Sequence, residues 1–136
     1  MNVLLFLTPK SQVAFLEADF TIRQGLEKME YHRYSSMPII DNRGHYIGTI
    51  TEGDLLWEIK NNFSLDLKKA EQTPLLSVKR LRDNKPVKAT ADVEDLLPIV
   101  MDQNFVPVID DQNIFIGIVT RKSIIQYLAN KNSVNC

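Results

Sequence analysis

A stretch of 25 residues occurs twice in this chain of 136 residues. The residues from Ser35 to Ile59 align without a gap with those from Asn104 to Leu128, so that each matched pair lies 69 positions apart. Six of the 25 pairs are identical, where ordinary composition would give about one or two. A duplication constrains the fold more than any single motif does. Two copies are expected to form a pseudo-symmetric pair with a cleft between its halves.

The apolar pattern of each copy predicts a strand, a helix, two strands and a second helix. In the first copy we expect a strand over 13–16, a helix from 19 or 21 to about 31, a hairpin over 37–50 and a helix from 51 to about 61. In the second copy we expect a strand over 87–89, a helix over 92–101, a hairpin over 106–119 and a helix over 122–130. Pro98 predicts a kink or an early end in the first of these two helices.

This order predicts an α+β fold of two tandem β-α-β-β-α repeats packed with pseudo-twofold symmetry. The expected domains are a first repeat with its N-terminal strand over 1–61, a linker over 62–82, a second repeat over 83–130 and a frayed tail over 131–136. The linker is polar, and one short helix is expected in it near 66–71.

Composition excludes several classes of protein. The single cysteine, Cys136, permits no intrachain disulfide, and the first ten residues lack the pattern of a signal peptide. The formal net charge of −1 gives no general attraction to nucleic acid or membranes. The two histidines, His32 and His45, have neither the spacing nor the neighbours of a metal site. We therefore expect a cytoplasmic protein that requires no cofactor.

The two copies differ most where the hairpin enters the second helix. Thr51 and Asp54 have the spacing of a helix-capping pair, and a carboxylate such as Asp54 can also accept hydrogen bonds from a ribose diol. The second copy keeps the cap residue but places Arg121 and Lys122 in the first helical turn, where cations oppose the helix dipole. A helix start with two cations suits a phosphate, and solvated surface is the alternative interpretation.

The doubled pattern of apolar-Pro-apolar-apolar-Asp, a turn, and aromatic-Ile-Gly-apolar-apolar-Thr resembles a tandem cystathionine-β-synthase (CBS) domain pair, or Bateman module. The resemblance extends from about Val13 to Leu128. It implies that two repeats pack through their sheets, that pairs form a homodimer, and that clefts between repeats bind adenosine-containing ligands.

The resemblance also implies a set of nucleotide-binding residues. Thr51 and Asp54 would hold the ribose or phosphate, and Arg121 and Lys122 would meet phosphates from the other repeat. Adenine would lie between the first strand and the entry to the second, where the matching positions are Val13, Ala14, Tyr34, Ser36, Met37 and Pro38. Ser123 stands where the family has its ribose-binding acid, so we expect one good site per chain.

No motif of a nucleophilic, phosphate-cradling or metal-dependent enzyme is present in the sequence. We therefore predict that the chain is not an enzyme. The resemblance implies a regulatory module that senses AMP, ADP, ATP or cyclic di-AMP and signals to an unknown effector protein. The alternative is a dimerisation or scaffold module with a vestigial cleft that binds nothing.

Overall fold

The computed structural model describes residues 1–62 and 66–135. The chain divides into two compact units. The first-repeat unit is Ala14–Asp83, and the second-repeat unit consists of Met1–Val13 together with Asn84–Cys136. Each unit has its own hydrophobic core and its own sheet, which confirms the α+β class predicted from the duplicated pattern.

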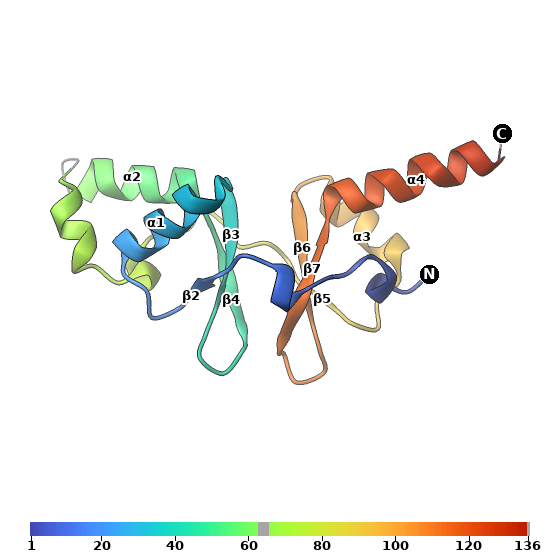
Figure 1. Ribbon diagram of the computed structural model, residues 1–136, viewed down its shortest axis with the longest axis horizontal. Helices are drawn as coiled ribbons and strands as arrows, with labels where there is room; N and C mark the ends of the chain where they lie inside the picture. The colour runs from blue at the N-terminus through green and yellow to red at the C-terminus, as the bar shows by residue number, and fades with distance from the viewer. Residues whose placement is uncertain (63–65, 136) are drawn as a thin grey trace. The chain divides into compact units, whose positions relative to one another are not determined.

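The first-repeat unit has a three-stranded sheet in the order β2-β3-β4. Its strands are β2 (Leu16–Glu17), β3 (Ser36–Ile40) and β4 (Tyr46–Thr51), and its helices are α1 (Ile22–His32) and α2 (Glu52–Asn62). β2 is parallel to β3, and β4 is antiparallel to it. Both helices lie on the same side of the β3–β4 hairpin (Figure 1). Helix α1 begins with a capping box in which Thr21 and Gln24 satisfy each other's backbone N–H groups.

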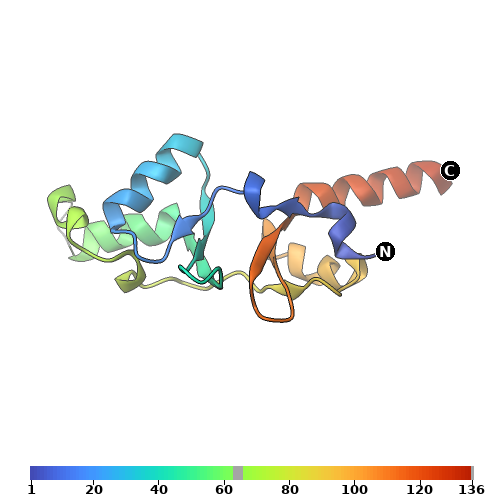
Figure 2. The same cartoon turned by 60° about the horizontal axis from the view of Figure 1, so that its bottom comes forward.

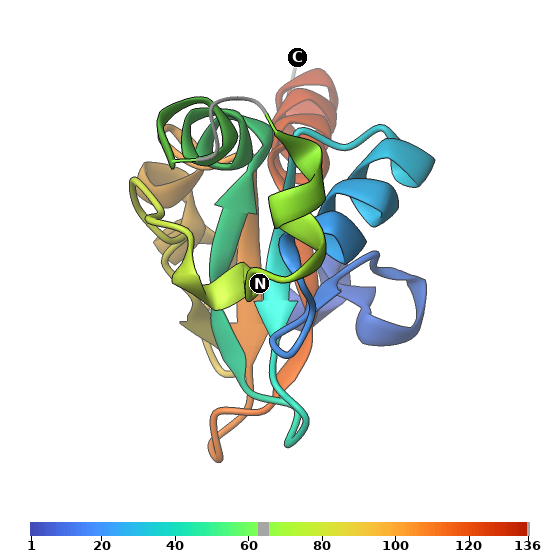
Figure 3. The same ribbon diagram turned by 90° about the vertical axis from the view of Figure 1, so that its left-hand side faces the viewer.

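The expected linker is part of the first-repeat core. Two 3-10 helices, η3 (Leu67–Glu71) and η4 (Leu75–Ser77), follow α2, and residues 63–65 lie outside the described residues. Ala70, Leu75 and Val78 are all buried in the same cluster as the strands and helices. Figure 3 shows the yellow-green η3 between α1 and α2. The prediction of a separate linker over 62–82 is therefore corrected: its apolar residues complete a core that two short helices leave open.

The second-repeat unit has a four-stranded sheet in the order β1-β7-β6-β5. Its elements are β1 (Thr8–Pro9), β5 (Val87–Lys88), β6 (Phe105–Ile109), β7 (Phe115–Thr120), α3 (Val93–Val100) and α4 (Arg121–Asn135), with the 3-10 helices η1 (Val3–Phe6) and η2 (Lys10–Gln12) near the N-terminus. β5 is parallel to β6, and β7 is antiparallel to β6, which repeats the arrangement of β2, β3 and β4.

The N-terminal segment packs with the second repeat, not with the first as predicted. β1 pairs antiparallel with β7, with Thr8 opposite Ile118 and Pro9 opposite Gly117. Figure 2 shows the blue segment beside the orange-red β7. Gly117 makes this approach possible, because a Cβ atom there would lie 2.2 Å from the Thr8 carbonyl oxygen and its φ is +156°. The unpaired edge of β7 thus gains a strand from a segment more than 100 residues away in sequence.

The two helices of the second repeat, α3 and α4, differ in how their ends compare with the sequence-based expectations. Helix α3, which contains Pro98, is eight residues long, against eleven for α1. This early end agrees with the missing N–H donor of proline. Of the tail expected over 131–136, the residues as far as Asn135 continue helix α4, while Cys136 lies outside the described residues.

The two hairpins use the same turn chemistry. Asp41 Oδ1 accepts hydrogen bonds from the N–H groups of Arg43 and His45, at 2.9 and 2.8 Å. In the second repeat, Asp110 Oδ1 accepts hydrogen bonds from the N–H groups of Gln112 and Ile114. The hydrogen bond from the His45 N–H lowers the pKa of Asp41 below its ordinary value and outweighs the opposing effect of burial, and the hydrogen bond from the Arg43 N–H lowers the pKa further. The left-handed turn residue is Gly44 in one hairpin and Asn113 in the other.

Candidate functional site

The start of α2 holds Asp54 in a fully used capping arrangement. Asp54 Oδ2 accepts the Thr51 N–H at 3.0 Å, and the Asp54 N–H donates to Thr51 Oγ1 at 3.0 Å. The other carboxylate oxygen, Oδ1, accepts the N–H of Leu81 at 3.2 Å. The side chain is buried, with 9% of its surface exposed. The capping interpretation is confirmed, and a ribose would have to share a carboxylate that already holds two backbone donors.

Several other predicted residues gather at the same end of the first-repeat sheet. Ser36 lies opposite Thr51 in the β3–β4 ladder, and Met37 lies opposite Ile50. Met37 and Pro38 are buried in the sheet, and Met37 belongs to the first-repeat core. Ala14 packs against the same core, two residues before the Leu16 that pairs with Ile39.

Val13 and Tyr34 are the two predicted adenine-contacting residues that do not belong to the buried part of the first-repeat sheet. Val13 is the last residue of the N-terminal segment in the second-repeat unit, so the chain passes from one unit to the other between Val13 and Ala14. Tyr34 is 53% exposed and its ring stacks on His32, with the ring centroids 5.5 Å apart. Tyr34 is therefore not a core residue, and an exposed aromatic ring of this kind can stack on a base.

Arg121 has a structural partner that the sequence did not reveal. Its Nε donates to the carbonyl oxygen of Val100 at 2.7 Å, at the last residue of α3. A cation is favourable at the C-terminal end of a helix, where carbonyl groups lack partners. The apparent conflict of a cation in the first turn of α4 is thereby resolved. Lys122, by contrast, is exposed and forms no ion pair within residues 1–62 and 66–135.

The helix start of the second repeat retains only part of the first repeat's arrangement. The Ser123 N–H donates to Thr120 Oγ1 at 3.1 Å, and the two hydroxyl oxygens lie 2.8 Å apart. Ser123 stands at the position of Asp54 and supplies no carboxylate. A ribose diol would therefore find no charged acceptor there.

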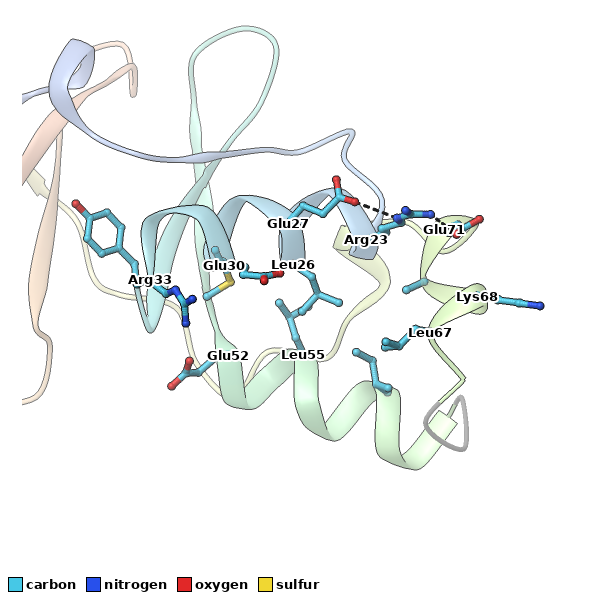
Figure 4. Close-up of a pocket in the computed structure, with 14 residues that line it drawn as sticks. Arg23, Leu26, Glu27, Glu30, Arg33, Glu52, Leu55, Leu67, Lys68 and Glu71 are labelled. Carbon is cyan, nitrogen blue, oxygen red and sulfur yellow. Dashed lines mark hydrogen bonds and ion pairs between the residues drawn. The ribbon is translucent and has the colours of Figure 1, made fainter.

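A groove of about 720 Å³ lies elsewhere in the first-repeat unit, between α1, α2 and η3 (Figure 4). Its floor is apolar and includes Met29, Leu55 and Ile59. The side chain of Arg23 bonds to Glu27 and Glu71 at one end, and these two acids raise the pKa of Arg23 above its ordinary value, first through the Glu27 hydrogen bond. The lining contains four acids, Glu27, Glu30, Glu52 and Glu71, and three cations, Arg23, Arg33 and Lys68. Of the predicted site residues, this lining contains Tyr34.

Sequence reasoning missed the contacts that residues 80–83 make with β4 and with the start of α2. Asp83 Oδ1 accepts the Thr49 N–H at 2.9 Å, and Arg80 Nε donates to the same oxygen at 2.7 Å. A Cβ atom on Gly48 would lie 2.3 Å from that oxygen, so the glycine leaves room for this carboxylate. The Leu81 contact joins residues 27 positions apart, and no local pattern in the sequence could have indicated it.

The fold and these positions can be compared with known proteins. The family model described as "CBS domain" matches residues 7–61 and again residues 78–130, which together make up most of the chain. The chain belongs to the CBS domain family. The duplicated pattern thus marks a tandem CBS pair, as the resemblance implied.

Solved structures and one curated protein are similar to this CBS pair. A crystal structure of CbpB in complex with c-di-AMP is 26% identical, with a TM-score of 0.84 over 96% of this chain and 85% of that chain. CbpB from Streptococcus agalactiae is 27% identical, with a TM-score of 0.78 over 91% of this chain and 77% of that chain. Inosine-5'-monophosphate dehydrogenase of Methanocaldococcus jannaschii is 29% identical over 118 residues, which are 84% of this chain. The chain spans about one fifth of that enzyme, or 21% of its length.

Within the part of the chain that the structure describes, no group of three or more His, Cys, Asp or Glu side chains could hold a metal ion. None of the described helices is long and apolar enough to cross a lipid bilayer.

Proposed function

We propose that this CBS pair is a regulatory module that senses an adenosine nucleotide and signals to a partner protein. The observation that carries the proposal is the similarity, over 96% of the chain, to a CBS-pair protein whose structure contains c-di-AMP. A ligand can regulate such a module only if it binds one arrangement of the protein better than another. We propose AMP, ADP, ATP and cyclic di-AMP as the candidate ligands.

The proposed binding residues are those of the sequence analysis, now weighted by their geometry. Ala14 and Tyr34 are proposed to contact adenine, with Ser36, Met37, Pro38 and Val13 beside them. Thr51 and Asp54 are proposed to contact the ribose, and Lys122 the phosphates. Arg121 is proposed to contribute through its guanidinium NH₂ groups, because its Nε is held by Val100.

A homodimer is also proposed, because the same apolar position is exposed on α2 and α4. Leu56 is 53% exposed and the matching Ile125 is 56% exposed, while the preceding residues, Leu55 and Ile124, are buried. Trp57, the next residue of α2, is 56% exposed and therefore does not belong to the core. Size-exclusion chromatography with light scattering should give a dimer for the wild type and a monomer for Leu56→Glu. A wild-type monomer at micromolar concentration would contradict the homodimer.

Thermal melting with a panel of nucleotides tests the sensing function. A ligand at a hundred times its dissociation constant should stabilise the folded state by about 2.7 kcal/mol, which raises the melting temperature by several degrees. Guanosine monophosphate at the same concentration is the matched control. No shift with AMP, ADP, ATP or cyclic di-AMP would remove the basis of the proposal.

The alternative, a scaffold with a vestigial cleft, is supported by one feature of the geometry. Asp54 and Arg121 both have structural partners, so their presence does not by itself require a nucleotide. The melting experiment separates the two functions, because a scaffold would dimerise without any nucleotide-dependent shift.

A further inference from the structure

The side chain of Gln103 forms a two-way hydrogen bond with one backbone residue in the second-repeat unit. Gln103 Oε1 accepts the Lys85 N–H at 2.6 Å, and Gln103 Nε2 donates to the Lys85 carbonyl oxygen at 3.2 Å. The Nε2 group also donates to the Phe105 carbonyl oxygen at 3.2 Å. The side chain is buried, with 9% of its surface exposed. Such a group is held in one position, because every bond it could lose would leave a buried polar atom without a partner.

The strand register identifies the residues of the first repeat that match this pair. Leu16 pairs with Ile39 as Val87 pairs with Val108, so Lys85 corresponds to Ala14. The N–H that opens α2 donates to the Ser35 carbonyl, and the N–H that opens α4 donates to the Asn104 carbonyl. Gln103, the residue before Asn104, therefore corresponds to Tyr34, the residue before Ser35.

The matched backbone groups differ in their partners. Within residues 1–62 and 66–135, no hydrogen bond involves the main-chain N–H or C=O of Ala14. Tyr34 cannot supply the missing bonds as Gln103 does, because its side chain is exposed and stacked on His32. The donor and acceptor of Ala14 are thus available, whereas those of Lys85 are occupied.

A backbone N–H and C=O on one residue complement the edge of adenine. Adenine presents a ring-nitrogen acceptor beside the N6 amino donor, and a carboxamide presents an oxygen acceptor beside an NH₂ donor. Both therefore offer the same acceptor–donor pair to a backbone residue. Gln103 makes with Lys85 the two bonds that an adenine edge would make with Ala14.

We propose that Gln103 closes the second adenine position from within the chain, so that each chain binds one nucleotide, read by the backbone of Ala14. This inference rests on the proposed nucleotide sensing. It adds how adenine is recognised and how many nucleotides each chain binds. The absence of an acid at Ser123 removes the ribose contact at the same half, which agrees with a site that is not used.

Isothermal titration of the whole chain with AMP tests the stoichiometry. The wild type should bind one AMP per chain. The double variant Gln103→Ala, Ser123→Asp should bind two, because it frees Lys85 and restores an acid. Ser123→Asp alone should bind one. A wild-type stoichiometry of two would overturn this inference and leave the sensing function intact. A folded double variant that still binds one would show that Gln103 is not what closes the position.

The reverse substitution, Tyr34→Gln, is at an exposed residue, so the variant should fold as the wild type does. Tyr34→Gln should bring a carboxamide to the Ala14 backbone and weaken AMP binding by about tenfold to a hundredfold relative to Tyr34→Asn, whose shorter side chain does not reach. Equal affinities of these two variants would contradict the mechanism.

Amide hydrogen exchange in the absence of ligand measures the hydrogen bond between the Lys85 N–H and Gln103 independently of nucleotide binding. Exchange at the Lys85 N–H should be slow in the wild type and fast in Gln103→Ala. Fast exchange in the wild type would overturn the closure. Slow exchange with no binding of AMP would instead count against the sensing function.

Discussion

Replacing Asp54 by asparagine separates its structural role from its proposed role in binding. Asparagine has the same shape but only one acceptor oxygen, so it can satisfy either the Thr51 N–H or the Leu81 N–H, and its NH₂ group faces the other donor. Losing one hydrogen bond to a charged acceptor in a buried position costs about 1.5–3 kcal/mol of folding free energy. A domain of ordinary stability, about 5–15 kcal/mol, remains folded after this loss.

The same substitution should weaken nucleotide binding by a comparable free energy, about tenfold to a hundredfold, because the ribose loses a charged acceptor. Urea denaturation gives the stability cost, and calorimetric titration with AMP at 15 °C gives the affinity of the folded variant. Ser123→Ala is the matched control, because it alters the same position of the other repeat without removing a charge; its AMP affinity should be unchanged. A folded Asp54→Asn variant that binds AMP as the wild type does would refute the ribose contact and leave Asp54 as a helix cap.

Two further predictions concern stability. Gly117→Ala should destabilise the chain by about 2–4 kcal/mol and expose the N-terminal segment to limited proteolysis, because the new Cβ atom would overlap the Thr8 carbonyl oxygen. The control is Gly53→Ala, which should not destabilise the chain because its new Cβ atom would have only a 3.7 Å contact. Asp41 has a lowered pKa when folded, so its contribution to stability is present above the ordinary aspartate pKa of about 3.9 and is lost as the pH falls through the folded value. Urea denaturation of wild type and Asp41→Asn should therefore give a stability difference that shrinks on acidification from pH 6 to pH 2, and a constant difference would contradict the assignment.

The elements of each repeat could be predicted because the signals that form them are local. Thr21 and Gln24 have the spacing of a capping box, and Asp41 with Gly44 has the chemistry of a tight turn. Such residues bond to backbone groups a few positions away, so their effect can be inferred from spacing alone. The apolar alternation of the strands similarly required no knowledge of the partner strand.

The partners of the candidate site could not be predicted in the same way. The Leu81 N–H reaches Asp54 from 27 positions away, and Arg121 reaches the end of α3 from 21 positions away. Gln103 is an ordinary polar residue in the sequence, and only its burial against Lys85 shows that it acts as an internal partner. These contacts depend on where separate segments meet.

The sequence by itself therefore determined the duplication and the order of elements, because periodicity and capping act within a few residues of the chain. Only the tertiary structure decided that the N-terminal segment joins the second sheet, that the linker fills the first core, and that Arg121 caps a helix. Each of these outcomes satisfies an edge, a cavity or a carbonyl group that exists only after the chain has folded, so no local pattern could specify it.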